Sequence, residues 1–97
     1  MIVWVWDAKK NQINRRRHGL SLDTGIIALL DPLSMSAIDP HSDGNRMNTV
    51  GRAGGHVILF VVHTASERTD EGGETGRIIS VRKATKRERK AYEEGNH

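Results

Sequence analysis

The chain has 97 residues, which suits a single domain over residues 1–97, since domains typically run to roughly 100–150 residues. It has no cysteine, which excludes a disulfide scaffold, a cysteine nucleophile and thiolate zinc sites. Mean hydropathy is −0.55, and the longest apolar run, 57–62, is too short for a membrane helix. The opening MIVWVWD does not resemble a signal peptide, so we expect a cytoplasmic protein.

The cations are clustered along the chain. Lysine and arginine number 15 against 12 aspartates and glutamates, a formal charge of +3. Most of the cations lie in two segments: Lys9, Lys10, Arg15, Arg16, Arg17 and Arg82, Lys83, Lys86, Arg87, Arg89, Lys90. Such clusters are typical of proteins that bind phosphate-rich or acidic partners, and equally of exposed helices with solvated cationic faces. Charge alone leaves both interpretations open.

The first third of the chain predicts one strand and two helices. Ile2–Trp6 alternates in β-branched and aromatic residues, which indicates a strand. A surface helix, Ala8–His18, follows the N-cap Asp7 and ends at Gly19. Ser21 can cap a second helix, which ends at Asp31-Pro32. Its apolar stripe is predicted to enter the core and consists of Leu22, Ile26, Leu29 and Leu30.

The rest of the chain predicts an antiparallel meander and a last helix. The expected strands are 33–38, 47–51, 57–64 and 77–82, with polar loops at 39–45 and 65–76. The strand 57–64 is apolar on both faces and should be central. Thr85 and Glu88 form a capping box that opens a helix to about Glu94. The predicted fold is α+β, in the order β-α-α-β-β-β-(β)-α, with the sheet packed on two N-terminal helices and a C-terminal helix.

Several motifs in this order resemble a known family. They are Trp6-Asp7-x-x-Lys10-x-x-x-Asn14-x-x-Arg17-His18-Gly19, Leu30-Asp31-Pro32, Val50-Gly51-Arg52, Val61-Val62-His63-Thr64 and the run Arg77–Tyr92. In these motifs the chain resembles the BrnT toxins of bacterial type II toxin–antitoxin systems, which have a RelE-like ribonuclease fold. One feature departs from the family pattern: Ala65 and Ser66 separate the His-Thr pair from Glu67 and Arg68.

The resemblance implies an endoribonuclease that cuts RNA and blocks translation. It also implies a tight hetero-oligomer with a BrnA-type antitoxin, which neutralises the toxin and alone contacts DNA. No cofactor is implied.

RNA can be cleaved without a metal if a base deprotonates the ribose 2′-OH, cations stabilise the phosphorane and an acid protonates the leaving oxygen. Arginine suits the cationic role because its planar fork matches phosphate oxygens and keeps its proton. The candidate catalytic residues are Arg52, His63 and Arg82. A histidine that ends a strand is also commonly held by backbone hydrogen bonds, so a structural role for His63 stays open.

The candidate RNA-binding residues are Lys10, Arg77, Ser80, Arg89 and Tyr92. All of them except Ser80 have an alternative role. Lys10 shares a helix stripe with Asn14 and His18, which can equally dock the helix on the sheet. Arg77 can pair with an acid of the 67–74 loop, and the neighbours Arg89 and Tyr92 can stack a base or close the core.

The sequence predicts no metal site. The segment Asp39-Pro40-His41-Ser42-Asp43 contains metal-compatible groups, but its composition is that of a turn. Two functions remain for this chain: a metal-independent endoribonuclease toxin, or a non-catalytic basic module that binds nucleic acid or a partner protein.

Overall fold

The structure, a computed structural model, describes residues 1–41 and 45–95, and confirms an α+β fold. Its elements are β1 (Ile2–Val5), α1 (Ala8–His18), α2 (Thr24–Leu29), β2 (Met35–Ile38), β3 (Arg46–Arg52), β4 (Ile58–Thr64), β5 (Glu67–Arg68), β6 (Glu74–Lys83) and α3 (Lys86–Glu94). The described part contains no helix long and apolar enough to cross a membrane.

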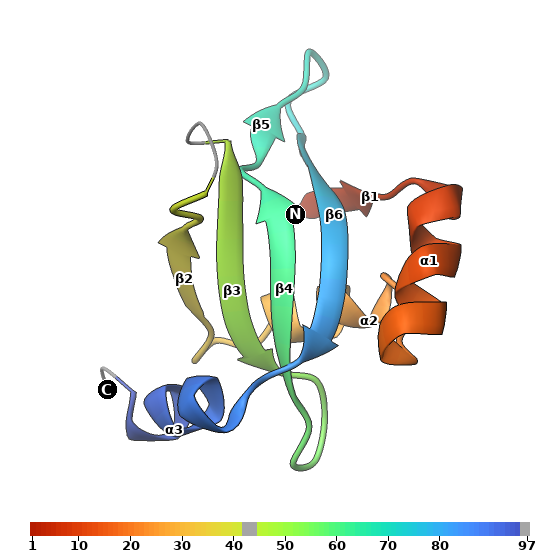
Figure 1. Cartoon of the computed structure of the whole chain (residues 1–97). Helices are drawn as coiled ribbons and strands as arrows, with labels where there is room; N and C mark the ends of the chain where they lie inside the picture. Colours follow the sequence, from red (N-terminus) through yellow and green to blue (C-terminus); the bar gives the residue numbers. More distant parts are fainter. Residues whose placement is uncertain (42–44, 96–97) are drawn as a thin grey trace.

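The strands form one sheet in the order β1-β6-β4-β3-β2, with β5 paired to β6. The pairs β2–β3, β3–β4 and β4–β6 are antiparallel, which is the expected meander, while β1 runs parallel to β6. Strand β4 is central, as its two apolar faces predict (Figure 1).

The prediction that residues 65–76 form a loop is wrong in part. Glu67 and Arg68 form β5 and pair with Thr75 and Glu74 at the start of β6, which is longer than expected. The two residues that separate the His-Thr pair from Glu67 and Arg68 are therefore followed by a short hairpin, seen at the top of Figure 1.

Some boundaries also differ from the sequence prediction. The first strand ends at Val5, and β2 begins at Met35. Ser21 does not cap α2: the helix begins at Thr24, whose backbone N–H and hydroxyl both donate to the Ser21 carbonyl. In the polar segment 39–45, residues 42–44, and with them Ser42 and Asp43, lie outside the described residues.

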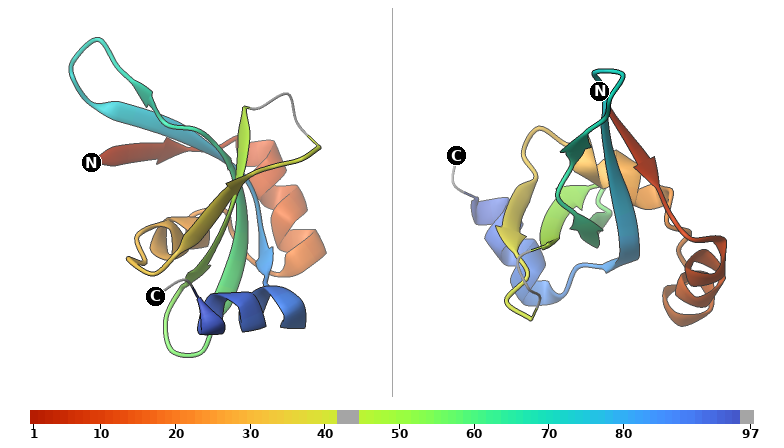
Figure 2. Two further views of the ribbon diagram at one scale, coloured as in Figure 1. Left: turned by 90° about the vertical axis from the view of Figure 1, so that its left-hand side faces the viewer. Right: turned by 90° about the horizontal axis from the view of Figure 1, so that it is seen from above.

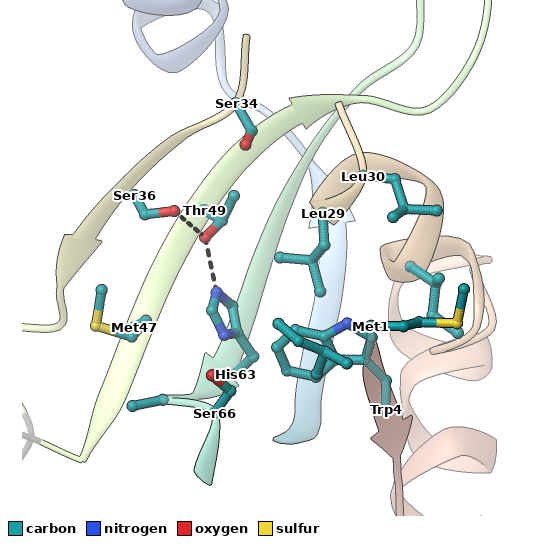
Figure 3. Close-up of a pocket in the computed structure, with 13 residues that line it drawn as sticks. Met1, Trp4, Leu29, Leu30, Ser34, Ser36, Met47, Thr49, His63 and Ser66 are labelled. Atoms are coloured by element: carbon teal, nitrogen blue, oxygen red, sulfur yellow. Dashed lines mark hydrogen bonds between the residues drawn. The ribbon is translucent and has the colours of Figure 1, made fainter. Parts of the chain in front are cut away.

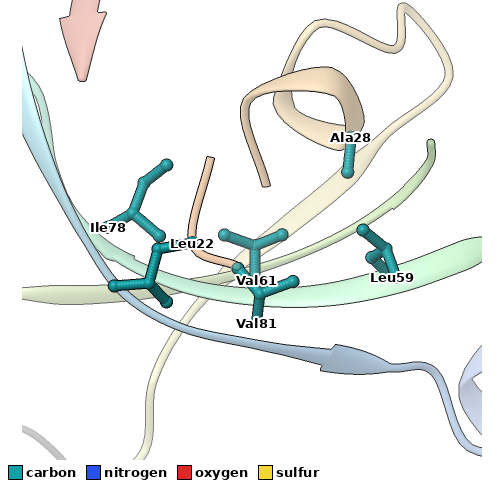
Figure 4. Close-up of a cluster of buried hydrophobic side chains, with 6 residues drawn as sticks. All are labelled: Leu22, Ala28, Leu59, Val61, Ile78 and Val81. Carbon is teal, nitrogen blue, oxygen red and sulfur yellow. The ribbon is translucent and has the colours of Figure 1, made fainter. Parts of the chain in front are cut away.

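Helix α2 covers one face of the sheet, which we call the covered face. The buried core there comprises Leu22, Ala28, Leu59, Val61, Ile78 and Val81 (Figure 4). Leu30 was predicted to join this core but is 74% exposed, and Ala28 is buried instead. A Cβ on Gly51 would lie 2.2 Å from the Ala28 carbonyl oxygen, so α2 contacts the backbone of β3 directly.

Helix α1 packs against the sheet at the exposed edge of β6, and not across one of the two faces. The buried Asn14 side chain donates to the Val81 carbonyl (2.9 Å) and accepts from the Val81 N–H (3.0 Å). Its amide thus pairs with β6 as a neighbouring strand would, beyond the residues that β1 pairs. This explains how a helix with almost no apolar face is held in place.

Helix α3 begins at the predicted capping box, in which Thr85 and Glu88 each satisfy the other's backbone N–H. In the side and top views, α2 and α3 lie on opposite sides of the curved sheet (Figure 2). Because α3 crosses only the lower end of the sheet in Figure 1, most of this second face is left without a helix. We call it the open face.

Candidate functional site

The open face is defined by strand register. On β4, Phe60 and Val62 point away from the core, because Leu59 and Val61 between them are buried. Cross-strand partners share a face. The open face therefore includes Arg82 and Ser80 on β6, Arg52, Val50 and Asn48 on β3, and Met35 and Ala37 on β2.

Arg82 has the best-defined geometry on this face. Its guanidinium carbon lies 4.0 Å from the centroid of the Phe60 ring. Nη1 and Nη2 donate to the two carboxylate oxygens of Glu88 at 2.8 and 2.9 Å, and Nη1 also donates to the Lys83 carbonyl at 3.1 Å. The side chain is still 32% exposed. Stacking and pairing together fix a planar cation at the surface.

These bonds use one edge of the Arg82 guanidinium. Among the described residues, no partner engages Nε–H or the second hydrogen of Nη2. Those two N–H groups point in the same direction and form a second fork, whose geometry fits two oxygens of one phosphate. Arg82 is therefore able to bind an oxyanion while Glu88 holds it.

Glu88 has a role beyond the capping box that sequence analysis gave it. Its Oε1 accepts from both the Thr85 N–H and Arg82 Nη1. The hydrogen bonds from Arg82 lower the pKa of Glu88 most, against an opposing effect of burial, so the carboxylate stays ionised at neutral pH. The sequence contains no local signal for this pair, because a turn separates the strand residue from the helix residue.

Arg52 lies on the same face as Arg82. It pairs with Ile58 on β4, two residues from Phe60, the partner of Arg82. At strand spacings of about 4.8 Å and about 3.4 Å per residue, the two Cα atoms are about 12 Å apart. The arginines therefore flank one stretch of β4 and share the open face.

A polar network holds the Arg52 end of the face. Asp31 Oδ2 accepts from the Arg52 N–H at 2.8 Å and from the Tyr92 hydroxyl, while Oδ1 accepts from the Leu33 N–H. Burial opposes ionisation of Asp31, but these hydrogen bonds outweigh it and lower its pKa. The bond to Asp31 in turn raises the pKa of Tyr92. The Arg52 guanidinium carbon lies 5.9 Å from the Tyr92 ring centroid.

The two α3 candidates are engaged within the protein. Tyr92 is 3% exposed, so its ring closes the packing of α3 and does not present a surface for base stacking. Arg89 donates to the His56 carbonyl and lies 3.8 Å from a Glu93 oxygen. Of the two alternatives for this pair, the geometry favours closure of the core.

Two other candidates meet in a cleft between α1 and β6. This α1–β6 cleft has a volume of about 190 Å³ and is lined by Lys10, Ile13, Asn14, Arg17, His18, Ile79 and Ser80. Lys10 and Ser80 thus come together from distant parts of the chain. Arg77 lies towards the other end of β6, where it lines a separate cavity of about 250 Å³ with Glu67 and Thr64.

His63 lies on the covered face, away from the arginines. Its Nδ1 donates to the Thr64 carbonyl (2.8 Å), so Nε2 accepts the Thr49 hydroxyl (2.7 Å), and Ser36 donates to Thr49 (Figure 3). Burial lowers the pKa of His63, although the bond to Thr64 opposes the shift. A neutral ring with both nitrogens occupied matches the structural alternative for this residue.

A cavity of about 510 Å³ lies beside His63. Its walls are mostly apolar and include Trp4, Leu29 and Met47 (Figure 3). The Trp4 and His63 rings meet edge to face with centroids 5.2 Å apart. The cavity lacks the cations that a phosphodiester needs, so the covered face does not suit the predicted chemistry.

Metal coordination has no candidate in the described ranges 1–41 and 45–95, where no three histidine, aspartate or glutamate side chains gather. The prediction of a metal-free reaction remains a prediction.

Two residues of the open face were not predicted from the sequence. Phe60 supports the Arg82 guanidinium, yet in the sequence it is simply one apolar residue of a buried-looking strand. Asn48, opposite Val62, has a buried Oδ1 that finds no hydrogen-bond partner among the described residues. The alternation of β4 could have indicated Phe60, but only once its open side was known.

The fold and site together define a small α+β protein with arginines on an uncovered sheet face. Comparison with known families then identifies it. The model of the family "Ribonuclease toxin, BrnT, of type II toxin-antitoxin system" matches residues 6–88, so the chain belongs to this family. Such a toxin has an RNA substrate and an antitoxin partner.

A solved structure supports the assignment. The crystal structure of the Brucella abortus ribonuclease toxin, BrnT, superposes with a TM-score of 0.60 at 25% identity, over 89% of this chain and 99% of that one. Among proteins of curated function, none matches the chain. The RelE-like character of the fold is not tested by these comparisons and stays a prediction.

Proposed function

We propose that this ribonuclease toxin is a metal-independent endoribonuclease whose open face binds RNA and whose Arg82 contacts the scissile phosphate. The observation that carries the proposal is the second N–H fork of Arg82, fixed above Phe60 by Glu88 on a face that α2 leaves uncovered. Arg52 supplies a second cation across β4.

In this reaction the ribose 2′-oxygen attacks phosphorus and forms a cyclic phosphodiester, while the bond from phosphorus to the 5′-oxygen breaks. The 2′-OH proton leaves to a base, and the departing 5′-oxygen takes up a proton. Negative charge grows on the non-bridging oxygens, where the Arg82 fork stabilises it. A preorganised donor of this kind contributes about 100- to 1000-fold to the rate. The products are a 2′,3′-cyclic phosphate and a 5′-hydroxyl.

The resemblance to the family implies the biological setting of this proposal. Cutting RNA in the cytoplasm blocks translation. A BrnA-type antitoxin neutralises the toxin by covering cationic surface in a hetero-oligomer, and contacts DNA on behalf of the complex. Arg52 and Arg82 on one uncovered face give an acidic antitoxin segment a surface to occupy.

The test is RNA cleavage by the purified chain, free of antitoxin, in EDTA. Wild type should cut single-stranded RNA to cyclic-phosphate ends and leave the same sequence in DNA intact, because DNA lacks the nucleophile. Arg82→Ala should lose about 100-fold or more in kcat/KM. Arg15→Ala, which removes an exposed arginine of α1, is the matched control and should stay within about twofold.

Salt-sensitive binding of RNA without cleavage would instead support the non-catalytic basic module. Cleavage that needs added divalent metal, or that survives Arg82→Ala unchanged, would contradict the proposed mechanism.

A further inference from the structure

The α1–β6 cleft is a concave, cationic surface that the proposed reaction does not use. Helix α1 contains no acidic residue, and no acidic side chain lines the cleft. Lys10 and Arg17 lie on its helical wall, on either side of Asn14, and neither forms an ion pair within the described part of the chain. The cleft therefore presents unneutralised positive charge.

The shape of the cleft is fixed by the fold. Asn14, at its floor, bonds both backbone groups of Val81, so α1 cannot move away from β6 without breaking buried hydrogen bonds. Lys10 and Arg17 are about 10 Å apart along the helix, at about 1.5 Å per residue. Ser80 faces them from β6 and adds a hydroxyl donor. A phosphate could thus contact both walls of the cleft.

The cleft also leads to the catalytic arginine. Ser80 and Arg82 lie on the same side of β6, opposite Val62 and Phe60, and are about 7 Å apart. An RNA backbone that extends from Arg82 along β6 towards Ser80 therefore enters the cleft. Ser80 thus belongs both to the cleft and to the open face that carries Arg82.

We propose that the α1–β6 cleft is a second phosphate-binding subsite, which holds the RNA backbone away from the phosphate at Arg82. This inference rests on the proposed function, because it places the scissile phosphate at Arg82. Lys10, Arg17 and Ser80 bind phosphate oxygens, with no base contact required. RNA that is long enough to fill both subsites binds more tightly than RNA that fills one.

The test compares two double variants of equal charge. Lys10→Gln/Arg17→Gln removes the two cations of the cleft, whereas Lys9→Gln/Arg15→Gln removes two exposed cations of the same helix that do not line it. The probe is a 12-nucleotide single-stranded RNA with 2′-O-methyl groups, which cannot be cut. Affinity is measured against salt concentration.

The cleft variant should bind about tenfold more weakly than wild type at low salt, and its salt slope should be shallower by about 1.4, at about 0.7 per lost phosphate contact. The control variant should change affinity by less than about twofold. The loss of affinity in the cleft variant should be smaller for a 3-nucleotide probe. Equal losses in the two variants, or no dependence on probe length, would overturn the subsite.

Binding of a 12-residue poly-glutamate peptide tests whether the cleft recognises acidic protein instead of RNA. If the cleft variant loses affinity for the peptide as strongly as for RNA, the cleft recognises acidic protein, and the RNA subsite is wrong. Cleavage of unmodified RNA by wild type is measured separately. If wild type cuts no RNA while the binding difference persists, the proposed function fails and the subsite stands. If wild type cuts but the variants bind alike, the subsite alone fails.

Discussion

Neighbouring residues of β4 lie on opposite faces of the sheet, in very different surroundings. On the covered face, Leu59 and Val61 are buried under α2, and His63 completes a chain of hydrogen bonds. On the open face, Phe60 and Val62 are half-buried, and arginines project beside them. The two-residue period of a strand therefore places alternate residues of β4 in the core and on the face that we propose binds RNA.

Substitutions on the two faces should therefore have different effects. Side chains of the covered face meet backbone and apolar groups, so changes there should cost folding free energy. Side chains of the open face that α3 does not cover meet solvent and one another, so changes there should alter RNA binding or cleavage at little cost in stability.

The largest effect is expected where α2 contacts β3. Gly51→Ala places a methyl group 2.2 Å from the Ala28 carbonyl oxygen, and backbone must move to accommodate it. Urea denaturation should show a loss of about 3 kcal/mol in unfolding free energy. Gly73→Ala, whose Cβ meets only the Thr69 hydroxyl at 3.4 Å, is the control and should cost less than about 1 kcal/mol. Equal costs would mean that α2 does not pack this closely.

Removal of the edge contact should have the next largest effect. Asn14→Ala deletes hydrogen bonds to Val81 and to the Leu20 carbonyl and leaves the buried Val81 N–H without a partner. Thermal or urea unfolding should show a loss of about 2 kcal/mol. Gln12→Ala, at an exposed position of the same helix, should change stability by less than about 0.5 kcal/mol. A similar loss in both variants would refute the role of Asn14 as a strand substitute.

On the open face, Glu88→Gln should separate positioning from folding. Glutamine cannot present two charged oxygens to Arg82, so the guanidinium is held less firmly. We expect kcat to fall about tenfold. KM should not rise, because a negative charge is removed beside the RNA. Glu94→Gln, which loses an exposed charge of α3, should change neither constant. A rise in KM with unchanged kcat would contradict a positioning role.

The smallest effect concerns pH. Burial lowers the pKa of His63 in the folded state, so the unfolded chain takes up the proton first. Stability should therefore be complete above about pH 6.5 and fall as pH drops below it. Asp31 and Glu88 also have lowered pKa values, but their contribution is lost only at lower pH. Urea denaturation at pH 7.5 and 5.5 should show this fall in wild type and not in His63→Asn.

Local sequence patterns predicted most of the elements. The apolar residues on both faces of β4 predicted its central place, and the residues Asp7, Gly19 and Thr85 marked helix ends correctly, because caps depend on neighbours in the chain. The exposure of Leu30 was not predicted, because the apolar stripe shows which side of the helix faces the sheet but not where the sheet ends beneath it.

The site was less predictable, because it depends on register between strands. The spacing of arginines along the chain could not show that Arg52 and Arg82 share a face while His63 lies on the other. Asn14 was expected to dock α1, yet its pairing with the edge of β6 needs two residues far apart in sequence. The contact of Arg82 with Phe60 and Glu88 likewise appears only after folding.

The most direct test of the account is methyl NMR during titration with the 2′-O-methyl RNA. Val50 and Val62 report on the open face, whereas Leu29 and Met47 line the cavity of the covered face. If RNA binds the open face, the methyl signals of Val50 and Val62 should shift, and those of Leu29 and Met47 should stay unchanged. Shifts confined to Leu29 and Met47 would place the RNA beside His63 and contradict the account.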